Sequence, residues 1–514
     1  MNSNLTFSKS DGIWLLFATI IPSSMTFIDS TALNVALPAI QRDLNLTGAE
    51  LLWIVNGFTL FVSALLLVGG SIGDVVGRKK VFMLGIVLFV VSSVTCALAT
   101  NGFWLIVFRS IQGIGAALLI PGSLSLITAL FPKERRARAI GIWSMFSAIT
   151  TIAGPILGGF LSENGLWRWI FLINVPLGAI ALLILFKKVR ETSSESTLMP
   201  HYLSPILAII SLALICYGLI QMSVESFSNV FLQVCIAAGI VLFVLFIWFQ
   251  KVSNRPMLPL EMFKNKTFAA TNVITFLIYG ALSATLFFFP LVLIQAQGYT
   301  PIEAAISMIP LVILIGGLSV LSGKIVAKFG YRLPLIFGPL ITGLGFLAFE
   351  LPDLTSGIQS YWSTFFIPIV LTGIGMGITV VPLTTTVMSS GGEDRSGISS
   401  GINNTVSRLA GLIAIAVFGT LGISIFKALV LKDVVPFSLT QIQLNELSAQ
   451  LINYGDAKVP LSLEYLKTEI SQIIKLRLVS SFKIISVLSG SITLFTVLIS
   501  MIFIKRRTVV AQTD

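Results

Sequence analysis

The stretch GSIGDVVGRKK (Gly70–Lys80) lies where one long apolar run of the sequence stops and the next has not begun. Its last residues, Arg78 to Lys80, place three positive charges together, and such charges hold a short loop on the cytoplasmic side of a membrane. Gly73 and Gly77 remove side chains from one helix face, so another backbone can approach closely. Asp74 stands between them. The stretch predicts a cytoplasmic turn between two membrane helices, with a plain charged loop as the alternative.

The composition indicates a protein that is embedded in a lipid membrane. Of 514 residues, 55% are hydrophobic and 11% are charged, and the mean hydropathy is +0.96, whereas soluble domains carry about 25% charged residues. The net charge of +11 therefore needs a topological explanation, and we expect no nucleic-acid partner. Cys96, Cys216 and Cys235 all fall inside apolar runs, so we expect no disulfides. We also expect no cleavable signal peptide, metal or cofactor.

The apolar runs predict an all-α membrane protein with fourteen spans, because a helix needs about 20 residues to cross a bilayer. An even number of spans places both termini on one side of the membrane. The expected spans are 13–36, 50–73, 81–100, 104–130, 137–160, 168–187, 202–222, 230–249, 268–294, 302–323, 333–350, 361–389, 397–425 and 480–504.

The distribution of positive charge predicts the orientation. With the N-terminus in the cytoplasm, 22 of the 33 lysines and arginines fall at the N-terminus, in cytoplasmic loops or at the C-terminus. Two, Arg42 and Arg168, fall in short outer loops, and seven belong to a long outer segment that reaches Lys483. The remaining two, Arg109 and Arg408, lie inside spans. This bias predicts a multi-pass protein of the plasma or inner membrane with both termini in the cytoplasm.

An internal repeat divides the chain. GKIVAKFGYR (Gly323–Arg332) repeats the spacing of Gly70–Lys79, with Ala327 in the place of Asp74. GIGMG (Gly373–Gly377) likewise echoes the glycines that follow Arg109. Two halves built alike predict a transporter with its path at their interface. We expect a six-span half at 1–190, a linker with two inserted spans at 191–262, and a second half at 263–514 that contains an outer segment, 426–479.

Six motifs occur in order along the expected helices: FIDSTALNVALP (Phe27–Pro38), GSIGDVVGRKK, RSIQGIGAA (Arg109–Ala117), AGPILGG (Ala153–Gly159), WRWIFLINVPLG (Trp167–Gly178) and FKNKTF (Phe263–Phe268). Together they resemble the major facilitator superfamily, and within it the fourteen-helix drug:proton antiporters of the EmrB and QacA types. Val75 stands where that family often has Arg, and Thr150 replaces the first glycine of its fifth-helix signature.

The resemblance implies proton-coupled efflux of drugs or other small amphipathic compounds, and so antibiotic resistance, by alternating access. The protein would not be an enzyme. An importer or exporter of an endogenous metabolite on the same fold is the alternative. The expected partners are a small-molecule substrate, the proton and the lipid bilayer. We expect a monomer and leave open an accessory partner in an outer envelope.

Asp29 and Arg109 are the expected proton-coupling residues. Asp29 is the one acid well inside an expected span, where a charged side chain costs at least about 2.5 kcal/mol. The protonation equilibrium of a carboxyl group shifts when the group moves between wet and dry surroundings, as a proton carrier requires. Arg109 stays charged and demands acceptors, and Asp29 is the candidate partner. Permanent structural pairing is the alternative.

Three further groups of residues complete the expected sites. A substrate cavity would be lined by Asn34, Asn56, Phe58, Gln112 and Trp143. By the resemblance, a conformational latch would involve Gly70, Asp74, Gly77, Arg78 and Arg138, with Asp74 near the start of the thirteenth span or Arg138 in an outward-open state. The antiporter motif is Gly154, Pro155, Gly158 and Gly159, where close packing of small residues without directional meaning is the alternative.

Two expectations concern the second half. Arg408 lies inside the thirteenth span, and Asn403, Asn404 and Ser407 are expected to satisfy it structurally. In the outer segment, Leu466–Arg477 predicts an amphipathic helix near the outer surface. Because the spans offer one buried carboxylate, we expect neutral, zwitterionic or monocationic substrates.

Overall fold

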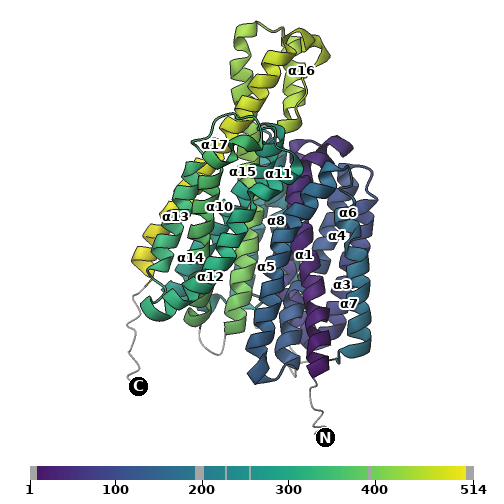
Figure 1. Ribbon diagram of the computed structural model, residues 1–514, viewed down its shortest axis with the longest axis vertical. Coiled ribbons are helices and arrows are strands. Elements are labelled where there is room, and N and C mark those ends of the chain that lie inside the picture. The colour runs from purple at the N-terminus through teal and green to yellow at the C-terminus, as the bar shows by residue number, and fades with distance from the viewer. Residues whose placement is uncertain (1–8, 192–201, 226–227, 254–255, 392–395, 505–514) are drawn as a thin grey trace.

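The computed structural model describes residues 9–191, 202–225, 228–253, 256–391 and 396–504 as a bundle of helices (Figure 1). The α-helices are α1 (Lys9–Leu44), α2 (Gly48–Val76), α3 (Arg78–Ala97), α4 (Gly102–Leu130), α5 (Lys133–Glu163), α6 (Trp169–Leu172), α7 (Asn174–Lys188), α8 (Leu203–Met222), α9 (Val230–Val252), α10 (Lys266–Gln295), α11 (Pro301–Ser307), α12 (Ile309–Phe329), α13 (Pro334–Ala348), α14 (Phe366–Ser390), α15 (Ser396–Asp433), α16 (Gln441–Leu451) and α17 (Lys467–Phe503). Short 3-10 helices are η1 (Leu260–Lys264), η2 (Ile358–Ser363), η4 (Val435–Phe437), η5 (Tyr454–Asp456) and η6 (Leu461–Leu466).

Each of the fourteen expected spans corresponds to a helix. Thirteen are long and apolar enough to cross a membrane, and the remaining one, α13, is a shorter apolar helix. The sixth span consists of α6 and α7, and the tenth of α11 and α12. The expected all-helical membrane fold is therefore confirmed.

Short polar sequences set the starts of several helices. Thr47 and Glu50 form a capping box at the start of α2, and Thr300 and Glu303 form another at α11. These residues satisfy backbone N–H groups that have no partner within the helix. Prolines inside helices, such as Pro155 in α5, are tolerated because neighbouring helices satisfy the freed backbone groups.

The helices form two halves that pack alike. In the first half α4 packs on α2 and α3, and α1 packs on α5; in the second, α14 packs on α12 and α13, and α10 packs on α15. The contact of α3 with α7 has its counterpart in α13 with α17. The inserted pair, α8 and α9, pack on each other, and α8 also touches α2 and α15 at the seam between the halves.

The ends of the bundle differ. α1 begins and α17 ends at the lower end in Figure 1, whereas α16 and the adjoining parts of α15 and α17 rise above the upper end. Arg477 Nε donates to Asp433 Oδ2 at 2.5 Å and ties the two rising helices together. The expectation for Leu466–Arg477 was wrong in one respect. Apart from Leu466, this stretch is the beginning of α17, continuous with the last span because no helix breaker separates them.

The two halves meet closely at the upper end. Gln41 at the top of α1 receives a hydrogen bond on Oε1 from Gln295 Nε2 of α10 (2.9 Å). A Cβ built on Gly159 of α5 would lie 2.7 Å from the backbone oxygen of Pro301, so α5 and α11 touch backbone to backbone. This state is closed at the upper end.

Candidate functional site

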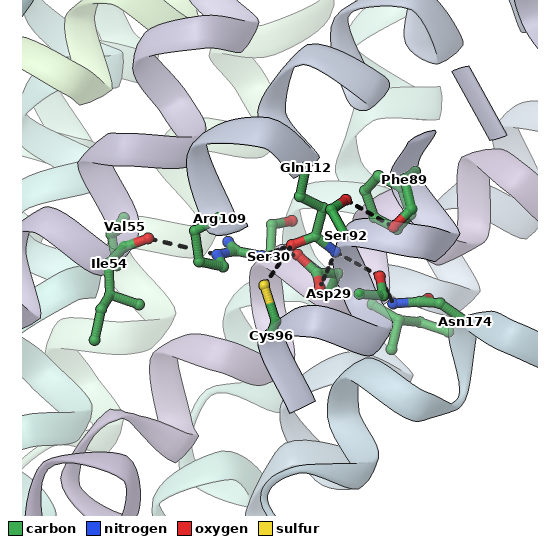
Figure 2. Close-up of polar contacts among 12 residues, drawn as sticks. Asp29, Ser30, Ile54, Val55, Phe89, Ser92, Cys96, Arg109, Gln112 and Asn174 are labelled. Carbon is green, nitrogen blue, oxygen red and sulfur yellow. Dashed lines mark hydrogen bonds and ion pairs between the residues drawn. The ribbon is translucent and has the colours of Figure 1, made fainter. Parts of the chain in front are cut away.

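An ion pair lies inside the first half, between α1 and α4. Arg109 Nη1 is 2.5 Å from Asp29 Oδ2, and the two side chains are 1% and 0% exposed. Figure 2 shows Asp29, Arg109 and Gln112 pointing toward one another, with Ile54 on one side and Asn174 on the other. The structure thus brings together the two residues that the sequence selected for proton coupling.

Gln112 joins both members of the pair. It accepts a hydrogen bond from Arg109 Nη1 on Oε1 (2.6 Å) and donates from Nε2 to Asp29 Oδ1 (3.1 Å). The same amide nitrogen donates to Ser93 Oγ of α3 (2.8 Å), which also receives a hydrogen bond from Asn174 Nδ2 of α7 (3.2 Å). Four helices therefore hold the carboxylate through one polar network, which is closed to solvent.

Ser93 and Asn174 were not expected from the sequence. Both are completely buried, and a buried polar side chain needs a hydrogen-bond partner. A polar residue at an otherwise apolar position of each span was the available signal. Asn174 Oδ1 has no partner, so the network retains an unused acceptor beside the ion pair.

The rest of the Arg109 guanidinium is held by backbone and aromatic groups. Its Nε donates to the backbone oxygen of Ile54 (3.4 Å), and its Cζ lies 4.5 Å from the centre of the Phe58 ring and 5.8 Å from that of Phe171. A cation over a ring face gains roughly 0.5–2 kcal/mol. Arg109 therefore keeps several contacts when Asp29 is protonated. The proton can neutralise the carboxylate while the guanidinium retains its backbone and aromatic contacts.

The antiporter-motif glycines bring α5 against α1 next to this network. A Cβ at Gly154 would lie 1.9 Å from Thr31 Oγ1, and one at Gly158 would lie 2.3 Å from the backbone oxygen of Ala32. Gly159 faces the second half instead. The motif thus forms two close contacts, one within the first half and one across the halves, and Pro155 lies inside a continuous helix.

The residues expected to line a substrate cavity do not gather in one place. Phe58 and Gln112 belong to the surroundings of the ion pair. Asn56 is fully buried, and neither of its amide atoms has a hydrogen-bond partner. Trp143 is half-buried and donates from Nε1 to Ser23 Oγ (3.0 Å), and Asn34 is half-buried on α1. Contact of these residues with substrate stays a prediction.

The expected latch is described only in part. The side chain of Asp74 lies outside the described residues, so its expected contact is not visible; Arg138 is exposed, and Gly70 packs near Pro121. Gly77 joins α2 to α3 with φ +123°, a conformation that favours glycine. The turn ends at Arg78, the first residue of α3.

A further acid, missed from the sequence, binds this turn. Glu191 accepts hydrogen bonds from the backbone nitrogens of Lys79 (3.0 Å) and Lys80 (3.1 Å), at the start of α3. A carboxylate is stabilised there by the partial positive charge of the helix N-terminus. A Cβ on Gly77 would lie 2.8 Å from Glu191 Oε1, so this glycine also makes room for the acid. Glu191 directly follows the basic run at 187–190, which was the available signal.

The expectation that its neighbours satisfy Arg408 was wrong. Asn403 Oδ1 accepts a hydrogen bond from Thr275 Oγ1 of α10 (2.8 Å), and Ser407 Oγ donates to the backbone oxygen of Asn404. Asn403 is engaged elsewhere because helix periodicity directs it toward α10, and, among the residues described, the side chain of Asn404 makes no hydrogen bond to Arg408. Within the described ranges, no group of three or more His, Cys, Asp or Glu residues could hold a metal ion.

Two similar helical halves, one of which holds a buried ion pair, in a chain with many membrane-spanning helices define a membrane transporter. The chain belongs to the Major Facilitator Superfamily, whose sequence pattern matches residues 20–415. It is therefore a membrane transporter and not an enzyme.

Its relatives include proteins named for drug resistance. The methylenomycin A resistance protein of Bacillus subtilis (strain 168) is 32% identical over 417 residues, which cover 80% of this chain and 88% of that protein. The tetracenomycin C resistance and export protein of Streptomyces glaucescens is 31% identical over 411 residues, which cover 79% and 75%. The multidrug resistance protein Stp of Mycobacterium tuberculosis (strain ATCC 25618 / H37Rv) is 30% identical over 410 residues, again 79% and 75%.

Solved structures show the same fold. A bacterial homologue of the human lysosomal transporter Spinster, in an inward-facing and unoccupied conformation, aligns with a TM-score of 0.68 and 19% identity. The alignment covers 98% of this chain and 99% of that one. At this identity the likeness concerns the fold alone.

Proposed function

We propose that the protein exports small amphipathic compounds across the cell membrane in exchange for protons. The observation that carries this proposal is the Asp29–Arg109 pair, a carboxylate that can take up a proton deep inside one half of the transporter. Three relatives whose names refer to resistance or export support the direction. The glycine contacts of α5 with α1 and α11 provide the closely packed surface that a bending or sliding helix needs.

The exchange follows from the geometry of the network. With Asp29 ionised, Oδ2 accepts from Arg109 and Oδ1 from Gln112. A proton on Asp29 removes the ion pair, and Arg109 keeps Gln112, the Ile54 carbonyl and the Phe58 ring. Since α1 carries Asp29 and packs on α5, a change in this ion pair can shift α5, which in turn contacts α11 of the second half.

We also propose that the lower end of the bundle faces the cytoplasm, with both termini there. The basic residues of the α2–α3 turn and of the last turn of α7 lie at that end, as the positive-inside rule requires. In this orientation the state described is closed to the outside. The upper extension then stands on the outer surface.

The test is proton release driven by substrate in inside-out vesicles. Asp29→Asn keeps the size and shape of the side chain but replaces one acceptor by a donor and cannot carry the proton, so the substrate-driven pH change should disappear while protein still reaches the membrane. Asp43→Asn is the matched control, because Asp43 pairs with Arg168 (2.6 Å) at the exposed upper end. Proton release by Asp29→Asn at the wild-type level would contradict the proposal.

A further inference from the structure

Arg408 on α15 is a cation without an anion. The side chain is half-buried, and its Nε atom is shielded from solvent and has no hydrogen-bond partner. In the described part of the chain, no ion pair or side-chain hydrogen bond reaches it. A charge in a membrane span is costly unless it is paired or faces a polar space. Arg408 therefore requires a partner that the described residues do not provide.

Three sides of α15 are covered. Toward α2, a Cβ on Gly401 would lie 3.1 Å from Leu67, and one on Gly419 would lie 2.4 Å from Leu52. Toward α10, Ala410 and Ala414 lie closest to a Cβ built on Gly280. On a third side, α15 residues line a cavity of about 90 Å³ with the inserted pair; these are Ile402, Thr405, Val406 and Leu409.

Arg408 lies on the side of α15 toward α2, because it follows Gly401 by seven residues, or two helical turns. Asn404 and Arg408 are four residues apart, so they occupy one face of the helix, and Asn404 is exposed. This face borders α2 of the first half, so it is turned toward the seam between the two halves. Besides α2, α15 packs on α10 and α14 of the second half.

Two neutral polar groups accompany the guanidinium. Asn404 provides a carboxamide one turn before Arg408. One turn after it, Gly411 lies beside Ser283 of α10, whose Oγ would be 2.9 Å from a Cβ built on this glycine. The glycine lets the hydroxyl approach α15 on the side of Arg408. A guanidinium with an amide and a hydroxyl nearby suits a carboxylate, sulfonate or phenolate, all of which accept hydrogen bonds.

The charges of the two halves are unequal. Asp29 and Arg109 neutralise each other in the first half, whereas Arg408 is uncompensated in the second. The carboxylate on which the expectation of monocationic substrates rested is thus already paired. Among the described residues, Arg408 thus adds an unpaired positive charge beside the seam, which favours an anionic compound over a cationic one.

We propose that Arg408 binds an anionic group of the exported compound, with Asn404 and Ser283 beside it. The substrate class is amphipathic anions whose apolar part lies between the halves. This inference rests on the proposed export function, and it adds the charge of the substrate and the residue that recognises it.

Binding of two matched fluorescent probes to the purified full chain in lipid nanodiscs tests this assignment. The anion 1-anilinonaphthalene-8-sulfonate and the neutral N-phenyl-1-naphthylamine share one aromatic skeleton and differ in the sulfonate. Empty nanodiscs correct for partition into lipid. The wild-type chain should bind the sulfonate more tightly, and Arg408→Gln should reduce this preference about tenfold, because the variant loses the charged hydrogen-bond donor of the sulfonate.

Two further variants make the result specific. Arg408→Lys keeps the charge and should retain part of the preference, whereas Lys427→Gln removes a charge from the same helix near its upper end and should leave the preference unchanged. Equal affinity of the wild-type chain for both probes, or an unaltered preference in Arg408→Gln, would overturn the assignment. The binding measurements do not involve proton coupling, so failure here is distinguishable from failure of the Asp29→Asn test.

Discussion

Gln41 Nε2 of α1 donates a hydrogen bond to the backbone oxygen of Asn453 at 2.7 Å, although 411 residues lie between them in the sequence. Next to this contact, the backbone nitrogen of Gly48 donates to the backbone oxygen of Ile452 (2.9 Å). Tyr454 is buried against the rings of Phe288 and Phe426 in the second half. Residues 452–456, which we call the upper clasp, therefore bridge both halves at the closed end.

Loosening the upper clasp should favour opening at this end. A Cβ on Gly455 would lie 2.0 Å from Gln295 Oε1 and 2.9 Å from Leu478, so Gly455→Ala should push the clasp away from α10 and α17. Spin labels on cysteines introduced at Glu163 and Glu350, both exposed near the upper end, should report longer distances. The native cysteines are free and buried, so they should label poorly.

Gly141→Ala is the matched control for this variant, because a Cβ there meets nothing within 4 Å. Its distance distribution should match that of the unmodified chain. If Gly455→Ala also left the distribution unchanged, the clasp would not limit opening of the upper end.

The upper clasp should also respond to pH. Burial raises the pKa of Asp456 above its ordinary value of 3.8, while Lys458 and Arg42 oppose the shift. The closed clasp therefore binds a proton more tightly than an open, solvated one, and acidification toward the raised value should favour closure. The same spin-label distances should shorten as the pH falls from neutral toward the raised pKa of Asp456, and Asp456→Asn should abolish the response. If the distances in Asp456→Asn shortened by the same amount on acidification, another titratable group would be responsible for the pH response.

Removing one partner of the buried ion pair should lower the stability of the protein more than removing both partners. Arg109→Gln leaves the Asp29 carboxylate buried without its cation, which typically costs about 3–5 kcal/mol. The double variant Asp29→Asn, Arg109→Gln should be more stable to heating than Arg109→Gln alone. The fraction of protein that remains monodisperse after heating, measured by size-exclusion chromatography, should show which variant is more stable.

The exposed pair at the upper end provides the comparison. Arg168→Gln breaks an ion pair with Asp43 in which both side chains are substantially exposed, and such pairs contribute only about 0–1 kcal/mol. If Arg109→Gln and Arg168→Gln lowered the stability to heating equally, the buried pair would not be held as tightly as its geometry indicates.

The contact between α5 and α1 should tolerate no added methyl group. Gly158→Ala would press a Cβ against the backbone of Ala32, three residues from Asp29, so α1 would shift and the polar network with it. Transport should fall by at least about tenfold, since misplacing reacting groups by 1 Å costs up to about 10²-fold in comparable sites. Gly316→Ala, which has open space around it, should transport normally. Normal transport by Gly158→Ala would show that the contact can relax.

The sequence determined the spans and the charged residues inside them. A run of about 20 apolar residues crosses a bilayer whatever its neighbours are, so all fourteen helices could be located from local composition. Because burying a charge is costly, charged residues in such runs can be recognised from the sequence as unusual; these are Asp29, Arg109 and Arg408. Their pairing in the first half was predictable because one acid and one base occupied spans of the same half.

The side-chain contacts between helices depended on the tertiary structure. The hydrogen bonds of Gln112 to Ser93, and of Ser93 to Asn174, join three helices whose rotation about their axes depends on packing across the whole half. Glu191 reaches the start of α3 because the chain after α7 returns to that end of the bundle. Arg408 does not receive Asn403 as a hydrogen-bond partner because helix periodicity and the fit of α15 against α10 direct Asn403 elsewhere. Local hydropathy fixes which residues enter the membrane, but the direction that each side chain faces is set by long-range packing, which a single sequence does not display.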